Sequence, residues 1–420
     1  MAVFNYVAMT GIAFLFARSM SVVEFGYYGI AIATVKILSD ITPLGLEKLT
    51  LRAIPHYHIT GEWSEARGLL RFSPFAVFCA ALIICGSIVL YLVEGMHHGS
   101  SKALTIGTSV AFLPVVALFA YYLEKASAKE KYLSSTMLYR VLLPIIIFLA
   151  VFMVRRELGG HLSSLSAVLC YWAPWILLLP IMIFIARKAL PDAEATGERQ
   201  YIPRLWFRRS ASFLVYNISL TLMANIGVIA LGFLHVNKTS AGFFFAASQL
   251  SSILIAIATS TNRFYLPHLS MLIDRDESEG ITSIFAKRRL VMVIIGLAFF
   301  TVFIFLGKSL LKMYGPDYAD AWIPLLILTA GNVIAVRYSL SASYLQYQHH
   351  DKDVVIILIA AVATTLLLVP LLTFFYGIIG TAIACTVSKA VLFFLMQNRV
   401  NHVRRRILQD KHKNHLLLHW

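Results

Sequence analysis

The chain has 420 residues, of which 59% are hydrophobic and 14% are charged, and its formal net charge at pH 7 is +15. Soluble domains carry about 25% charged residues, so this composition excludes an ordinary water-soluble fold and indicates a membrane protein. In a membrane protein such a positive charge is explained by topology, and nucleic acid is not expected as a partner.

About twelve apolar stretches follow one another along the chain, with short charged segments between them. A transmembrane helix needs about 20 mostly apolar residues, whereas a barrel strand shows about ten residues of alternating character. The stretches are longer than such strands and apolar on nearly all faces, so we predict an all-α membrane protein with about twelve transmembrane helices. The predicted helices cover 2–17, 26–46, 73–93, 103–123, 138–154, 163–186, 210–233, 240–260, 288–310, 321–345, 354–375 and 377–397.

The first stretch is expected to remain in the mature protein. It begins at Met1 without a basic region, and no small-residue cleavage site follows it, so it does not resemble a removed signal peptide. Its shortness is explained either by a start site placed too far downstream or by a tilted or locally thinned environment.

The basic residues predict the orientation of the helices. With a cytoplasmic N-terminus, most of the 36 lysines and arginines lie in or beside the cytoplasmic segments, and few lie on the opposite side. This imbalance follows the positive-inside rule and predicts an even number of helices with both termini in the cytoplasm. The cytoplasmic segments are 47–72, 124–137, 187–209, 261–287, 346–353 and the tail from 398.

The chain divides near its middle. The longest hydrophilic stretch between helices runs from Arg187 to Arg209 and contains prolines, which indicates a linker. Gly26 and the aromatic residues after it correspond to Gly242 and its neighbours in the second half, as expected of an internal duplication, although Gly-aromatic pairs are also common at helix starts. The predicted organisation is a six-helix bundle over 1–190, a cytoplasmic linker over 191–208, a second six-helix bundle over 209–400 and a basic cytoplasmic tail over 401–420.

The helix predicted over 26–46 carries one small and polar face. A charged group at the bilayer centre costs roughly 2.5 to 3.5 kcal/mol, so this face is expected to point away from lipid. Lys36 either attracts an anionic phosphate or forms an i,i+4 ion pair with Asp40. The residues of the face are Gly29, Ala33, Lys36, Asp40, Pro43 and Glu47.

Two later helices also carry polar residues. Asn217, Thr221 and Asn225 lie on one face of the helix over 210–233, where hydrogen bonds between helices explain them as well as function does. Lys389 lies within the last helix, and that helix offers it no carboxylate. An ionisable residue without a local partner is a candidate for function.

The sequence shows no sign of catalysis. We find no glycine-rich nucleotide loop, no catalytic carboxylate pair in an extended loop and no nucleophile motif, so neither enzyme activity nor a cofactor is expected. The four cysteines lie in apolar segments without C-x-x-C spacing, so we expect them to pack as small apolar residues and to form no disulfide or metal site. They are Cys79, Cys85, Cys170 and Cys385.

Several short motifs occur in a defined order along the chain. An Ala-Arg pair precedes a short loop, which is followed by Phe-Gly-x-Tyr, an Asp, a Gly and an Arg. Later elements are Gly242, Pro267, YGPDYADAWIPLLIL at 314–328 and YGIIGTAIACTVS at 376–388. The residues of the opening pattern are Arg18, Phe25, Gly26, Tyr28, Asp40, Gly45 and Arg52.

In this order, and over nearly the whole chain, the motifs resemble polysaccharide exporters of the multidrug/oligosaccharidyl-lipid/polysaccharide (MOP) superfamily, in particular Wzx-type O-antigen flippases. The resemblance implies a MATE-like fold and a flippase that moves undecaprenyl-pyrophosphate-linked oligosaccharide across the bacterial inner membrane by alternating access, as surface polysaccharide and lipopolysaccharide synthesis require. It also implies H⁺ or Na⁺ as a coupling ion and polysaccharide polymerase machinery as a partner. Asn225 departs from the pattern, because relatives often carry an acidic residue there, which weakens the expectation of ion coupling through this helix.

A pyrophosphate is costly to bring through hydrocarbon, so a flippase needs a wet and cationic cavity. We expect this cavity to be lined by Arg18, Lys36, Arg52, Arg140 and Lys389. Further polar candidates, for ion coupling or for structure, are Asp40, Asn217 and Asn225.

Three alternative functions would require different residues in the membrane helices or in the loops. A drug or cation antiporter of the same fold would favour acidic cavity residues. A membrane-bound polymerase or ligase of lipid-linked sugars would carry a sizeable outside loop with catalytic residues, and a scaffold without transport activity would not explain the charges inside helices.

Overall fold

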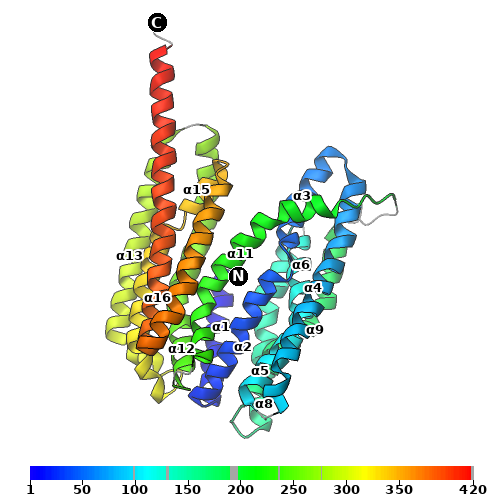
Figure 1. Ribbon diagram of the computed structural model, residues 1–420, viewed down its shortest axis with the longest axis vertical. Helices are drawn as coiled ribbons and strands as arrows, with labels where there is room; N and C mark the ends of the chain where they lie inside the picture. The colour runs from blue at the N-terminus through cyan, green and yellow to red at the C-terminus, as the bar shows by residue number, and fades with distance from the viewer. Residues whose placement is uncertain (98–99, 129–131, 190–196, 235–236, 276, 418–420) are drawn as a thin grey trace. The chain divides into compact units, whose positions relative to one another are not determined.

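The structure is a computed structural model. It describes all residues except 98–99, 129–131, 190–196, 235–236, 276 and 418–420, so the first part of the predicted linker lies outside the described residues. Helices make up most of the described part, and no strand occurs in it, which confirms the predicted all-α class. Figure 1 shows the helices coloured along the chain.

The helices pack into two compact units. Unit 1 consists of residues 1–245 and 312–318, and unit 2 consists of residues 246–311 and 319–420. The elements are α1 (Ala2–Ser19), α2 (Val22–Ile41), α3 (Leu46–Thr60), α4 (Trp63–His97), α5 (Ser101–Ala111), α6 (Leu113–Ser127), α7 (Tyr132–Met137), the π-helix η1 (Leu138–Leu142), α8 (Leu143–Glu157), α9 (Ser164–Ala189), α11 (Pro203–Phe233), α12 (Ser240–Asp274), α13 (Ser278–Leu311), the 3₁₀-helix η2 (Pro316–Ala321), α14 (Trp322–Arg337), α15 (Ser341–Tyr347) and α16 (Asp351–Leu417). The predicted division into two six-helix bundles rests on the repeat and stays a prediction.

Ten segments of the described chain are long and apolar enough to cross a membrane. They begin with α2 and end with a segment at Asp351–Ile407, which exceeds the about 20 residues that one crossing needs. The predicted set of about twelve helices counts that last segment as two and also includes α1, which is 18 residues long and is not among the ten.

The last segment is a helical hairpin. Gly377 has φ 57° and ψ −135°, a conformation that essentially only glycine adopts, and it interrupts α16. Eight residues of a continuous helix span about 12 Å, yet the hydroxyls of Thr373 and Thr381 lie 2.8 Å apart. Farther from the break, Arg399 forms an ion pair of 2.7 Å with Asp353. The chain therefore folds back at Gly377, where the sequence predicted a boundary between helices.

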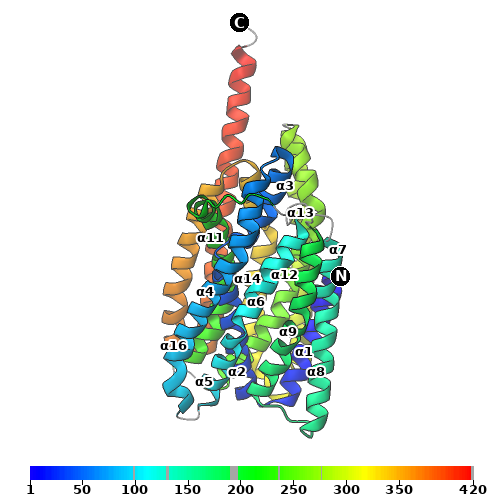
Figure 2. The same cartoon turned by 90° about the vertical axis from the view of Figure 1, so that its right-hand side faces the viewer.

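In unit 1, α4, α5, α6, α8 and α9 lie alongside one another (Figure 2). α3 packs beside α4 and α6, and it falls in a segment for which the sequence predicted no helix. Leu46, Leu49 and Tyr57 of α3 form a buried cluster with Leu69 and Trp206. This apolar face explains why α3 is helical, because an amphipathic helix gains most of its stability from packing.

The glycines matched by the repeat lie against each other in unit 1. A Cβ atom on Gly26 would lie 2.9 Å from the amide nitrogen of Gly242, and one on Gly242 would lie 2.2 Å from the carbonyl oxygen of Val22. The starts of α2 and α12 therefore approach more closely than any residue with a side chain permits.

Aromatic rings surround this close approach. The ring centroid of Phe25 lies 5.3 Å from that of Phe245, 6.1 Å from that of Tyr314 and 5.8 Å from that of Tyr318. Aromatic pairs in this distance range add to the stability gained by burial. Three of the sequence motifs thus contribute to one buried cluster in unit 1.

We expect Gly242→Ala to destabilise the protein by about 1–3 kcal/mol, because the added methyl group must displace backbone atoms of α2. A melting curve of the purified protein in detergent, followed by the loss of the monodisperse fraction, measures this change. Gly86→Ala is the control, since a Cβ atom there meets nothing within 4 Å. Equal melting temperatures for both variants would contradict the close packing.

Candidate functional site

The polar face of α2 meets the polar face of α11 in unit 1. The Thr221 hydroxyl donates a hydrogen bond to the Asp40 carboxylate, and the Asn217 amide donates one of 3.1 Å to Glu47 at the start of α3. The amide of Asn225 donates to the backbone carbonyl of Thr221 at 2.8 Å. The predicted residues Asp40, Asn217 and Asn225 are thus brought together.

The α2 and α3 helices reach this position through a glycine turn. Gly45 has φ 72°, in the left-handed region, and a Cβ atom there would lie 2.4 Å from the carbonyl oxygen of Ser210 on α11. Only glycine allows the turn and the approach at once. The turn brings Glu47, on α3, beside α11, so Asp40 and Glu47 lie on two helices and not on the single helix predicted for this stretch.

Glu47 is the most deeply buried carboxylate of the group, with 5% of its surface exposed. Its Oε1 accepts the hydrogen bond from Asn217, whereas its Oε2 is buried and has no hydrogen-bond partner among the described residues. Burial is the main reason that the pKa of Glu47 is raised to about 7, and the charges of Glu124 and Asp40 raise it further, against the lowering effect of Lys48. Glu47 is therefore able to hold or release a proton near neutral pH.

The charged neighbours of Glu47 are Asp40 of α2, Lys48 of α3 and Glu124 of α6. The Lys48 ammonium forms an ion pair with the Glu124 carboxylate. The cluster thus contains three carboxylates, those of Asp40, Glu47 and Glu124, and one ammonium. We call these four residues with Asn217 and Thr221 the carboxylate cluster.

Lys36 lies one turn before Asp40, but no ion pair or hydrogen bond joins the two side chains among the described residues. The Asp40 carboxylate instead accepts a hydrogen bond from Thr221. The pairing within α2 that the sequence allowed is thus not formed. Lys36 is half-buried, and its ammonium has no hydrogen-bond partner within the described part of the chain.

Arg140 and Arg52 also belong to unit 1. Arg140 lies in the π-helix η1, and such turns inside α-helices are rare and often mark functional sites. Arg52 is exposed on α3, and its guanidinium lies 4.8 Å from the ring centroid of Phe213.

Arg18 lies apart from these groups. It stands at the end of α1, just before α2 begins, so Lys36 is about 20 Å farther along the α2 axis. The Arg18 side chain donates a hydrogen bond of 2.8 Å to the carbonyl of Met313. Arg18 therefore links α1 to the segment 312–318, which also belongs to unit 1.

Lys389 belongs to unit 2, where it lies in the second arm of the α16 hairpin. Its ammonium donates a hydrogen bond of 2.8 Å to the side-chain oxygen of Asn332, and the Asn332 amide donates one of 2.9 Å to the carbonyl of Ser251. Asn332 is 1% exposed. A neutral amide thus orients the lysine, and no carboxylate pairs with it in the described part of unit 2.

Four residues of the carboxylate cluster, Glu47, Lys48, Glu124 and Thr221, were not among the predicted site residues. Glu47 and Thr221 were noted on the polar faces predicted for 26–46 and 210–233, Lys48 was interpreted only as a basic residue that sets the topology, and Glu124 was not considered. The helical spacing between Asp40 and Glu47 was the sequence signal that could have identified Glu47 as a site residue. The facing position of Glu124 on α6 depends on tertiary packing and has no counterpart in the sequence pattern.

Comparisons with known proteins agree with this architecture. A family model described as "Polysaccharide biosynthesis protein" matches residues 1–273. No curated protein sequence matches the chain.

Several solved structures share the fold. An inward-facing multidrug resistance MATE family transporter of the MOP superfamily has a TM-score of 0.75 and 11% identity, covering 97% of this chain and 96% of its own. The lipid II flippase MurJ, in an inward closed conformation, has a TM-score of 0.68 and 15% identity, covering 95% and 86%. A MOP superfamily transporter from Pyrococcus furiosus has a TM-score of 0.65 and 11% identity, covering 97% and 95%.

At these identities the structures establish the fold, and the chain has the MATE fold of the MOP superfamily. The sequence match covers well over half of the chain. The chain therefore belongs to the polysaccharide biosynthesis protein family.

Proposed function

We propose that this protein is a flippase that moves an undecaprenyl-pyrophosphate-linked oligosaccharide across the bacterial inner membrane. The proposed cycle is alternating access, with no catalytic step, and both termini lie in the cytoplasm. The family description, which concerns polysaccharide biosynthesis, supports the substrate class, and a lipid II flippase shares the fold.

One observation carries this proposal. Lys36 and Lys389 lie inside membrane-spanning segments, and neither forms an ion pair with a carboxylate among the described residues. A cation inside the membrane without a counter-charge is costly, and a bound anion would offset that cost. The pyrophosphate of a lipid-linked sugar supplies two phosphate groups of the required charge.

The substrate divides between two environments in this proposal. Its pyrophosphate and sugar cross through the polar interior, where Lys36, Arg52, Arg140 and Lys389 supply positive charge. Its lipid tail stays in the bilayer, because transfer of so much apolar surface into a wet interior is unfavourable. A proton held by Glu47 is the proposed coupling ion, and polysaccharide polymerase machinery is the proposed partner on the periplasmic side.

A second function has one specific observation in its favour. The carboxylate cluster brings Asp40, Glu47 and Glu124 together, and acidic groups in a transporter interior also suit an organic cation. An exporter of cationic drugs, driven by protons, is the alternative.

Deletion of the gene in its host distinguishes the two functions. For a flippase, we expect surface polysaccharide to disappear and lipid-linked repeat units to accumulate on the cytoplasmic face, with recovery when the wild-type gene returns. Unchanged polysaccharide together with new sensitivity to cationic drugs would replace the flippase by the exporter.

A further inference from the structure

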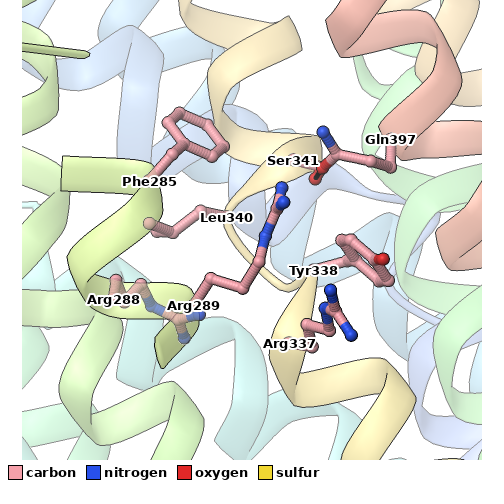
Figure 3. Close-up of a pocket in the computed structure, with 8 residues that line it drawn as sticks. All are labelled: Phe285, Arg288, Arg289, Arg337, Tyr338, Leu340, Ser341 and Gln397. Atoms are coloured by element: carbon pink, nitrogen blue, oxygen red, sulfur yellow. Dashed lines mark hydrogen bonds between the residues drawn. The ribbon is translucent and has the colours of Figure 1, made fainter. Parts of the chain in front are cut away.

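Unit 2 contains a second group of cationic residues, separate from Lys389. Arg288 and Arg289 lie on α13, and Arg337 is the last residue of α14 (Figure 3). With their neighbours they line a small pocket of unit 2, which the side chains fill in this arrangement. The other lining residues are Phe285, Tyr338, Leu340, Ser341 and Gln397.

Arg288 forms the floor of this arginine pocket. Its side chain is 1% exposed and donates hydrogen bonds to the carbonyl of Val336 at 3.0 Å, to the hydroxyl of Ser339 at 2.7 Å and to the side-chain oxygen of Asn262. All three acceptors are neutral. Its Nε is buried without a hydrogen-bond partner. The charge is thus solvated by dipoles but is not neutralised.

The other two arginines rest on one aromatic ring. The guanidinium carbons of Arg289 and Arg337 each lie 5.2 Å from the ring centroid of Tyr338. The Nε of Arg289 is also buried without a hydrogen-bond partner. Arg404 approaches Phe285 at 5.9 Å and donates a hydrogen bond to Thr282. Four positive charges therefore gather around the pocket.

In the described part of unit 2, no carboxylate pairs with these arginines. None of the four arginines forms an ion pair within the described part of the chain, although Arg399, on the same helix as Arg404, pairs with Asp353. The positive charges of neighbouring arginines repel one another, and the repulsion is stronger where protein excludes water. The fold holds the group together without an internal counter-ion, so an external anion would relieve the repulsion.

The arginines also lie at the polar ends of apolar segments. The apolar run of α13 begins directly after Arg289, and α14 ends at Arg337, so the pocket lies where membrane-spanning segments meet polar residues. Phosphate groups of lipids occupy this boundary. A guanidinium binds phosphate through two parallel hydrogen bonds, which a point charge does not offer.

We propose that the Arg288–Arg289–Arg337 pocket binds a phosphate group, carried either by an anionic membrane lipid or by a free phosphate compound. In the present arrangement the side chains fill the pocket, so the anion enters when Arg289 and Arg337 turn away from Tyr338 and take the phosphate between them. Arg288 stays in place and supplies the fixed charge beneath. This site does not depend on the proposed transport activity.

Binding to the purified full-length protein in an uncharged detergent tests the site. Two probes are titrated separately by calorimetry, short-chain phosphatidylglycerol and inorganic pyrophosphate. The test variant is Arg289→Gln with Arg337→Gln, which leaves the buried Arg288 intact. The control is Arg405→Gln with Arg406→Gln, which removes the same charge from exposed positions of α16.

We expect the test variant to bind at least tenfold more weakly than the wild type, and the control to bind within twofold of it. Binding of phosphatidylglycerol alone identifies a lipid headgroup as the ligand, whereas binding of both probes identifies a general phosphate site. Equal binding by the test variant and the wild type, or no binding of either probe to the wild type, overturns the proposal. Since no transport is measured, these outcomes leave the flippase proposal untouched.

Discussion

Replacing either Lys36 or Lys389 by glutamine is expected to reduce flipping by about ten- to a hundredfold. Each lysine places an ammonium inside a membrane-spanning segment, and neither ammonium has a carboxylate partner among the residues that the structure describes. A hydrogen bond to a charged group is worth about 1.5–3 kcal/mol, and each 1.4 kcal/mol corresponds to a factor of ten. Glutamine keeps most of the length and polarity of lysine and removes only the charge.

Flipping is measured with the purified protein in liposomes that contain a fluorescent lipid-linked pyrophosphoryl sugar, by the rate at which label becomes accessible outside. Lys238→Gln is the matched control, because Lys238 is exposed in the connection between α11 and α12. All variants should be recovered in the membrane in similar amounts. Normal rates for both Lys36→Gln and Lys389→Gln would rule out these lysines as substrate contacts.

Glu47 is expected to make the stability of the protein depend on pH. Because the folded-state pKa is raised from 4.5 to about 7, the folded protein holds this proton more tightly than the unfolded chain does. Its contribution to stability is complete below pH 4.5, falls as the pH rises toward 7 and is lost above that. The full change is on the order of 3 kcal/mol.

Melting temperatures in detergent at pH 5 and pH 8 measure this dependence. Glu47→Gln should show a smaller difference between the two pH values than the wild type, because glutamine does not titrate and keeps an oxygen for Asn217. Glu62→Gln, at an exposed site between α3 and α4, is the control. If the melting temperature of the Glu47→Gln protein changed between pH 5 and pH 8 as much as that of the wild type, another group would be responsible.

Much of this fold was predictable because its main signal is local. Runs of apolar residues predict helices directly, and the boundary predicted between 354–375 and 377–397 coincides with the break at Gly377. α3 was missed because it is only partly apolar, and its helical state depends on packing against Trp206 and Leu69. The first turn of α12 packs with unit 1 through Gly242, a grouping that the repeat alone does not predict.

The site was predictable only in part. Helical spacing placed Asp40 and Glu47 on one face of the helix predicted over 26–46. It placed Asn217, Thr221 and Asn225 on one face of the helix predicted over 210–233. That these two faces meet depends on how each helix is rotated about its axis, which spacing does not determine. Similarly, the sequence identified Lys389 as lacking a carboxylate on its own helix, but its contact with Asn332 comes from α14.

The hairpin of α16 has a consequence for biogenesis. Its two arms are joined at Gly377 by a sharp turn, across which the Thr373 hydroxyl donates a hydrogen bond to the Thr381 hydroxyl, which itself donates to the carbonyl of Gly377. If the first arm were inserted alone, the Thr373 hydroxyl would lack this partner in a medium that offers no water. The two arms are therefore expected to leave the translocon and enter the lipid together, so that the final step of membrane integration waits until synthesis has passed Arg399, whose ion pair with Asp353 then closes the open end.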